Sequence, residues 1–133
     1  MTRLRAAILG LAIVGAAIAA YLTYVHYADV APICTTGGCE KVQRSSYAKI
    51  GGIPVALLGL VAYCAIALTA LRRGVVPATA GAVVALGGAA FSGYLLWAQL
   101  GPIGAICQWC LGNDVVIALV AVLSVARLAT EPD

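Results

Sequence analysis

Residues 106–128 read ICQWCLGNDVVIALVAVLSVARL, in which a pair of cysteines opens a long and nearly uncharged apolar segment. An α-helix rises about 1.5 Å per residue, so about 20 apolar residues cross the roughly 30 Å hydrocarbon core of a bilayer. Three more apolar stretches of comparable length lie at about 6–26, 54–71 and 76–98. Because backbone polar groups must be satisfied internally in lipid, we predict that all four stretches are transmembrane helices.

The overall composition is also typical of a membrane protein. The chain has 133 residues, of which 63% are hydrophobic and only 10% are charged. So few charges cannot coat the surface of a soluble domain, and the excess apolar surface must face lipid. The net charge of +3 is small and scattered, which argues against a nucleic-acid partner. We predict an all-α fold, an integral membrane four-transmembrane-helix bundle whose natural environment is the lipid bilayer.

Basic residues predict the orientation of the bundle. An even number of spans places both termini and the connection between the second and third spans on one side. That side carries Arg3, Arg5, Arg72, Arg73 and Arg127. The loop at about 27–53 carries three basic residues, so the positive-inside rule places both termini in the cytoplasm and this loop outside, in the cell (inner) membrane. A signal peptide is the alternative for the first span, but its apolar run exceeds the usual 7 to about 15 residues, which favours an uncleaved span.

The extracytoplasmic first loop, at about 27–53, is the longest predicted connection. Its polar stretch from Glu40 to Lys49 is expected to form a short interfacial helix. Pro54 follows two glycines and would begin the second span, since a proline is tolerated in the first turn of a helix.

Four of the five cysteines form two pairs on the predicted outer side. Cys34 and Cys39 lie in the first loop, and Cys107 and Cys110 lie where the fourth span begins. Cys64 lies near the middle of the second span, where we expect a buried and inert thiol.

The second pair is a C-x-x-C motif at a predicted helix N-terminus. Its spacing places both sulfurs on one helix face, where the helix dipole and unpaired N–H groups stabilise a thiolate. A thiolate of lowered pKa is both a nucleophile and a good leaving group, as thiol–disulfide exchange requires. The first pair closes a turn that contains Gly37 and Gly38, so its cysteines can bond to each other or reach another thiol.

The two cysteine pairs fit three kinds of site. Two pairs on one side of a bundle favour a relay of disulfide exchange. Each pair could instead be a structural disulfide, and four cysteines also match the ligand number of a Cys₄ zinc site. Location outside the cytoplasm argues against zinc, because cysteines there usually oxidise. The sequence therefore favours a relay without a metal.

Four stretches of the chain together match a known family. They are Cys34, residues 39–48 (CEKVQRSSYA), residues 52–59 (GIPVALLG) and residues 107–110 (CQWC). In order and spacing they resemble the vitamin K epoxide reductase (VKOR) family, in its bacterial quinone-linked form. The resemblance covers nearly the whole chain and implies a single VKOR-like transmembrane domain over residues 1–133.

The resemblance implies a membrane thiol–disulfide oxidoreductase that drives disulfide formation. A reduced thioredoxin-fold (DsbA-like) partner would give electrons to the loop pair, with Cys34 forming the mixed disulfide. Cys39 would then attack Cys107, and Cys110 would pass electrons to a quinone of the menaquinone or ubiquinone type. Ser45 would hydrogen-bond near the quinone, although a helix-capping or interfacial hydroxyl is an equal alternative.

The chain departs from the family in two ways. Vertebrate relatives have a tyrosine four residues after the second C-x-x-C cysteine, where this chain has Asp114, so vitamin K epoxide chemistry is not carried over. Several bacterial relatives carry a fused thioredoxin-like domain, and here we expect a separate partner protein.

Polar and aromatic residues point to a quinone pocket near Cys110. Asp114 lies one turn further along the helix, where an ionisable group is a functional candidate by default. With Asn113 it would support proton uptake or hold a water, unless the two are only a buried hydrogen-bonded pair. Aromatic residues gather toward the outer side, as a pocket lining or an interfacial belt. The candidates for the lining are Tyr94, Trp97 and Trp109.

A rival function from another class is a small four-span transporter or assembly factor with purely structural disulfides. No predicted span holds the mid-membrane Glu or Asp that a small proton-coupled exporter needs. Quinone reduction that depends on Cys107 and Cys110 would separate the two functions.

Overall fold

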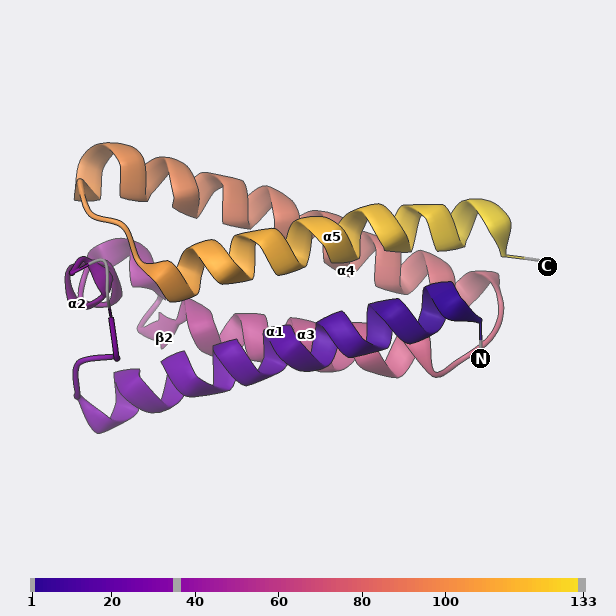
Figure 1. Ribbon diagram of the computed structural model, residues 1–133, viewed down its shortest axis with the longest axis horizontal. Helices are drawn as coiled ribbons and strands as arrows, with labels where there is room; N and C mark the ends of the chain where they lie inside the picture. Colours follow the sequence, from indigo (N-terminus) through magenta and orange to yellow (C-terminus); the bar gives the residue numbers. More distant parts are fainter. Residues whose placement is uncertain (1, 35–36, 132–133) are drawn as a thin grey trace.

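In the computed structural model, which describes residues 2–34 and 37–131, four long helices run antiparallel to one another along the length of the molecule (Figure 1). They are α1 (Arg3–Ala28), α3 (Val55–Ala70), α4 (Val75–Ala98) and α5 (Gln108–Thr130). Each agrees closely with a predicted apolar stretch. Helix α1 packs against α3 and α5, and α4 packs against the same two helices. The prediction of an all-α membrane fold is confirmed.

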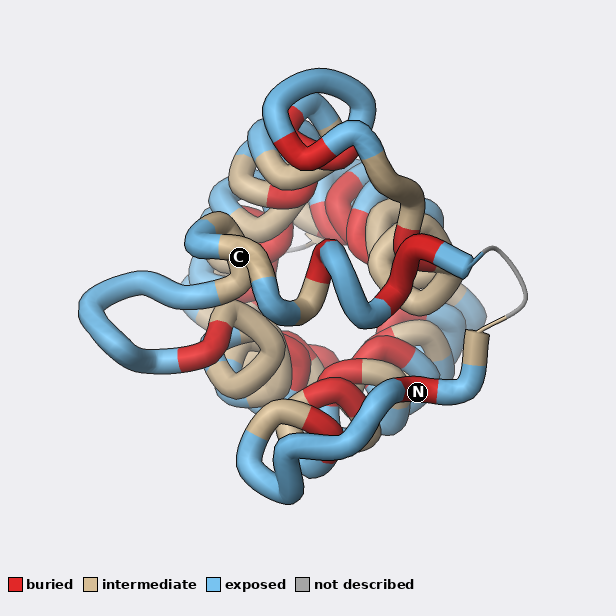
Figure 2. The backbone as a smooth tube through the Cα atoms, turned by 90° about the vertical axis from the view of Figure 1, so that its left-hand side faces the viewer, coloured by how far each residue is buried: buried red, intermediate tan, exposed pale blue. Residues whose placement is uncertain are grey.

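The bundle buries its centre and exposes apolar side chains outward. Viewed along the bundle, buried residues of each helix face the middle and exposed residues face out (Figure 2). Leu68, Val83 and Val122 are each more than 60% exposed. Large apolar side chains in such positions require a lipid environment. Three helical segments of the described chain are long and apolar enough to cross a membrane, whereas α3, with 16 residues, is shorter.

Cys64 shows how the two faces of α3 differ. The buried residues of α3 are Tyr63, Ile66 and Ala70, which lie three to four residues apart on one face. Cys64 is one position past Tyr63, about 100° around the helix, and its side chain is exposed. The prediction that Cys64 is buried is therefore wrong.

Two buried arginines hold the C-terminal end of α3. Arg5 Nε donates to the carbonyl of Ala70 at 2.9 Å, and Arg127 Nη1 donates to the carbonyl of Thr69 at 2.9 Å. Arg127 also donates to the carbonyl of Arg72 and contacts the Glu131 carboxylate. The last carbonyls of a helix have no partner within it, so these side chains complete the end of α3.

The loop between α1 and α3 folds over the other end of the bundle. It contains helix α2 (Cys39–Gln43), the 3₁₀ turn η1 (Ser46–Ala48) and a hairpin of β1 (Lys49–Ile50) and β2 (Ile53–Pro54). Gly51 and Gly52 both have positive φ, as the tight hairpin turn requires. The polar stretch contains helical segments as predicted, whereas the hairpin was not foreseen. Residues 35–36, in the predicted turn between Cys34 and Cys39, lie outside the described residues.

Candidate active site

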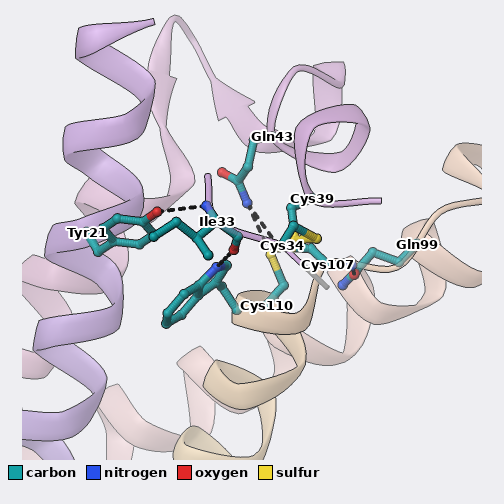
Figure 3. The surroundings of a disulfide bond; sticks show 9 residues. Tyr21, Ile33, Cys34, Cys39, Gln43, Gln99, Cys107 and Cys110 are labelled. Atoms are coloured by element: carbon teal, nitrogen blue, oxygen red, sulfur yellow. Dashed lines mark hydrogen bonds between the residues drawn. A yellow bond between two sulfur atoms is a disulfide. The ribbon is translucent and has the colours of Figure 1, made fainter. Parts of the chain in front are cut away.

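The four paired cysteines meet at the end of the bundle away from the termini (Figures 1 and 3). Cys39 and Cys107 belong to one buried cluster and are 0% exposed, and Cys34 and Cys110 pack against that cluster. Cys34 and Cys39 form a disulfide, with their Cα atoms 6.0 Å apart. Cys107 and Cys110 are thiols. The site therefore contains an oxidised loop pair beside a reduced inner pair.

Cys107 is placed by the end of the preceding segment. Helix α4 continues into a π-helical turn, η2 (Gln99–Ile103), and the buried Gln99 accepts a hydrogen bond from the backbone N–H of Cys107 at 2.9 Å. Cys107 is the N-cap of α5. This hydrogen bond fixes where α5 starts and therefore fixes the position of the C-x-x-C motif.

The backbone next to Cys34 is held by two aromatic side chains. The N–H of Ile33 donates to the hydroxyl of Tyr21 at 2.9 Å, and the indole N–H of Trp109 donates to the carbonyl of Ile33 at 2.6 Å (Figure 3). The rings of Tyr21 and Trp109 lie 4.9 Å apart. Because Trp109 lies within the C-x-x-C motif, this contact ties the loop pair to the inner pair.

The local environment favours the thiolate of Cys107. Its pKa is lowered below the ordinary value of a thiol, chiefly because the Cys110 thiol donates a hydrogen bond to it. Backbone N–H groups of Cys110 and Trp109 and the side-chain amide of Gln43 act in the same direction, whereas burial opposes them. Cys107 therefore carries the charge needed for thiol–disulfide exchange at neutral pH.

Cys110 lines a cavity of about 310 Å³ inside the bundle. Most of the lining is apolar and comes from all four long helices, including Ile18, Leu22, Leu58, Ala62, Phe91, Leu95 and Ile117. The polar groups are few and include Ser45, Asn113 and Asp114. An apolar cavity of this size with a few polar groups is typical of a small-molecule site.

Hydrogen bonds connect three of the polar residues that line the cavity, Tyr63, Asn113 and Ser92. Asn113 accepts a hydrogen bond from the hydroxyl of Tyr63 and donates one to Ser92 Oγ at 3.4 Å. Oδ2 of Asp114 is buried and has no hydrogen-bond partner among the described residues. Ser45 donates its hydroxyl proton to the carbonyl of Val42 at 2.7 Å, which leaves the oxygen as an acceptor. The buried carboxylate oxygen is the group in most need of a ligand.

The predicted aromatic residues lie elsewhere. Tyr94, Trp97 and Trp109 are not among the residues that line the cavity. Tyr94 and Trp97 are 47% and 56% exposed and stack on the outside of α4, and Trp109 points toward Ile33. The aromatic lining comes instead from Tyr47, Tyr63 and Phe91. A concentration of aromatic residues at one end of a bundle does not show whether each ring points into the bundle or outward.

Sequence reasoning assigned no role to two glutamines of the site. Gln99 positions Cys107, and the amide of Gln43 lies 3.2 Å from Sγ of Cys110 and 3.6 Å from Sγ of Cys107. Gln99 could have been noticed as a polar residue that ends a long apolar helix. Gln43 lies within a polar stretch, where a glutamine carries no such signal.

Comparison with known families shows what this arrangement belongs to. Residues 6–125 match the model of the vitamin K epoxide reductase family. The chain belongs to the vitamin K epoxide reductase family. The VKOR match covers α1 through most of α5 and includes all four paired cysteines. The protein is thus an integral membrane thiol–disulfide oxidoreductase, and the predicted membership of the VKOR family is confirmed.

Proteins of the VKOR family use quinones and generally work with a redox partner. The residues present fit a quinone, which has a flat ring with hydrogen-bond acceptors and an apolar body. The cavity supplies apolar walls, a thiol from Cys110, and polar groups from Ser45 and Asp114. These residues would hold the ring, and Cys110 would face it.

Proposed function

We propose that this VKOR-family protein passes electrons from a reduced thioredoxin-fold (DsbA-like) partner through its two cysteine pairs to a quinone, and so drives disulfide formation. One observation carries the proposal. Cys107 shares a buried cluster with Cys39 of the loop pair, while Cys110, one turn further on, lines the apolar cavity. The inner pair therefore connects the loop disulfide to the cavity.

The first exchange takes place at the loop pair. A thiolate of the partner attacks Cys34, which is partly exposed, and releases Cys39 as a thiolate. The second partner thiol then resolves the mixed disulfide. The partner leaves oxidised, and Cys34 and Cys39 have received two electrons and become thiols.

The second exchange transfers these electrons inward. The Cys39 thiolate attacks Cys107 of an oxidised inner pair and releases Cys110, and Cys34 then displaces Cys107 from Cys39. The loop disulfide is restored and the inner pair is reduced, which is the pairing described above. The lowered pKa of Cys107 makes it a good leaving group in this displacement.

Oxidation of the inner pair restores its disulfide. A bound quinone supplies an acceptor for two electrons and two protons. Cys110 lies at the cavity wall, where its sulfur would face the acceptor, and Cys107 would close the new S–S bond.

Asp114, whose Oδ2 has no partner among the described residues, would hold a proton for the acceptor, and the second amide N–H of Asn113 could donate to a ring oxygen. The Ser45 hydroxyl would orient the ring by turning its proton from the carbonyl of Val42 to a ring oxygen.

We further propose that α1, α3, α4 and α5 all span the bilayer, with the cysteines on the extracytoplasmic side and both termini in the cytoplasm. The antiparallel order of the four helices supports this orientation, as does the position of the arginines at the end that carries the termini. Disulfide exchange also requires the outer side, because the cytoplasm keeps thiols reduced.

The test is quinone reduction by the purified protein supplied with a reduced thioredoxin-fold partner. We expect Cys34→Ser and Cys110→Ser to abolish the reaction. A small dithiol that reaches the inner pair directly should restore activity to Cys34→Ser and not to Cys110→Ser. Cys64→Ser, which changes an exposed thiol outside the site, is the matched control and should keep full activity.

Activity that survives in Cys110→Ser would contradict the proposal. Rescue of both variants by the small dithiol would also do so, because electrons would then reach the quinone without the inner pair.

A further inference from the structure

Gln43 connects the loop pair to the inner pair. It lies on α2, four residues after Cys39, so the two residues are about one helical turn apart on the same face. Its side chain points from α2 toward the inner pair (Figure 3). Nε2 donates to Sγ of Cys110 at 3.2 Å and to Sγ of Cys107 at 3.6 Å.

The chemistry of an amide suits this position. A glutamine NH₂ group has two N–H donors and does not ionise, so it can serve two acceptors at every pH at which the protein is folded. A hydrogen bond to an anion is roughly twice as strong as one between neutral groups. The amide therefore stabilises a sulfur anion more than it stabilises a thiol. Burial strengthens this preference, since Cys107 is 0% exposed and water cannot solvate its sulfur.

We propose that Gln43 is a catalytic residue that stabilises the thiolate form of the reduced Cys107/Cys110 pair. This role deepens the proposed function, on which it rests. The pair loses one proton to solvent, and the remaining negative charge lies between two sulfurs that share one amide. The direction of the pKa of Cys107 agrees with the geometry, since the Gln43 amide contributes to its lowering after the larger effect of the Cys110 thiol.

The position of Gln43 also links the charge of the inner pair to the position of α2. Because Cys39 and Gln43 share this short helix, one displacement of α2 moves both. The inner thiolate is fully stabilised only while α2 lies against α5, which is also the position in which Cys39 reaches Cys107. The inner pair therefore takes its reactive thiolate form only while α2 lies against α5.

The experiment is a pH titration of the inner thiolate by its ultraviolet absorbance. The protein carries Cys64→Ser, keeps its loop disulfide, and has no quinone and no partner, so the inner pair supplies the signal. The midpoint of the parent protein is expected below the ordinary pKa of a thiol. Gln43→Leu should raise the midpoint by about one pH unit, a tenfold smaller dissociation constant. Gln43→Glu, which keeps the size of the side chain and adds a negative charge, should raise it further.

The matched control is Lys41→Leu, which changes an exposed residue of the same helix and should leave the midpoint in place. An unchanged midpoint in both Gln43 variants would overturn the proposal. If Gln43→Leu fails to fold, the Gln43→Glu variant, whose side chain has the same size as glutamine, still tests the proposal. Since the titration contains no quinone, a normal titration combined with a failed quinone assay would count against the proposed function alone.

Discussion

Gly38 packs so closely on the backbone of Ile106 that Gly38 has no room for a side chain. A Cβ atom placed on Gly38 would lie 2.7 Å from the nitrogen of Ile106 and would also overlap its carbonyl oxygen. These two residues immediately precede Cys39 and Cys107. Gly38 has φ of −103°, which any residue can adopt. The requirement for glycine here is thus steric. The close backbone contact that it permits brings the two cysteine pairs together.

Gly38→Ala should therefore slow electron transfer between the pairs. The added methyl group must push α2 away from the start of α5, and a misplacement of about 1 Å can cost roughly 100-fold in rate. The measurement is rapid quenching with an alkylating reagent after reduction of the loop pair, followed by mass analysis of each cysteine.

Gly87→Ala is the control for this variant, because Gly87 lies on α4 with open space around it. It should leave the exchange rate unchanged. A Gly38→Ala protein that exchanges at the parent rate would show that the close contact is not needed.

Trp109→Phe should loosen the loop pair. The change removes the indole N–H that donates to the carbonyl of Ile33, next to Cys34, and keeps an aromatic ring. Loss of one such hydrogen bond costs about 1 kcal/mol, so the loop disulfide should be reduced several-fold faster by a small dithiol. Tyr21→Phe, which removes the other contact to Ile33, should have a similar effect. Reduction rates equal to that of the parent in both variants would contradict this prediction.

The pKa of Cys107 predicts how oxidation of the inner pair depends on pH. Its pKa is lowered below that of an ordinary thiol, so the thiolate is lost as the pH falls through this lowered pKa and is fully formed above it. The single-turnover rate of quinone reduction should rise about tenfold per pH unit below the pKa and level off above it. A midpoint near 9, the ordinary value for a thiol, would show that the site does not activate Cys107.

Asp114→Asn should slow quinone reduction and leave the earlier exchange intact. The amide keeps the shape of the side chain but cannot hold the transferable proton, and general acid–base groups typically contribute about 100-fold or more. Partner-driven reduction of the inner pair, measured in the same samples, is the internal control because it does not involve the cavity. Normal turnover in Asp114→Asn would remove the proposed role of this residue.

Arg127→Met should destabilise the bundle without altering its chemistry. The change leaves the carbonyls of Thr69 and Arg72 without their donor and removes the ion pair of Glu131 with Arg127. The expected cost in the free energy of unfolding is about 3 kcal/mol. Thermal unfolding in detergent should show the loss. The exposed Arg73→Met should change stability by no more than about 0.5 kcal/mol. Equal stability of the two variants would argue against a structural role for Arg127.

The helical framework could be predicted because apolar length alone determines it. The segment at 76–98 contains hardly any polar side chain, and in lipid such a segment has only one way to satisfy its backbone. The hairpin at Lys49–Pro54 was not predicted, because its two-residue strands are too short to show alternation. Cys64 was placed on the wrong face because a helix that is apolar all round gives no clue to which face is buried.

The site could be predicted only as far as its cysteines. Their spacing identified both pairs, and the four motif stretches taken together identified the family. The contacts of Gln43 and Gln99 could not be predicted, because each depends on how the loop folds back onto α5. The prediction of the aromatic residues that line the cavity was wrong for a related reason. Tyr47 lines the cavity from the loop, whereas Tyr94 is exposed on the outside of α4.

The two buried arginines have a consequence for how the chain acquires its orientation. Arg5 and Arg127 are 6% and 3% exposed, and both donate to backbone carbonyls of the protein. In the folded bundle, the exposed basic residues at the end with the termini are Arg3, Arg72 and Arg73, and those at the other end are Lys41, Arg44 and Lys49. Packing therefore removes the difference in exposed basic residues between the two ends, while Arg5 and Arg127 keep their charges. All five arginines at the end with the termini are thus available to the positive-inside rule while the segments enter the bilayer, whereas in the finished fold two of them also stabilise the end of α3.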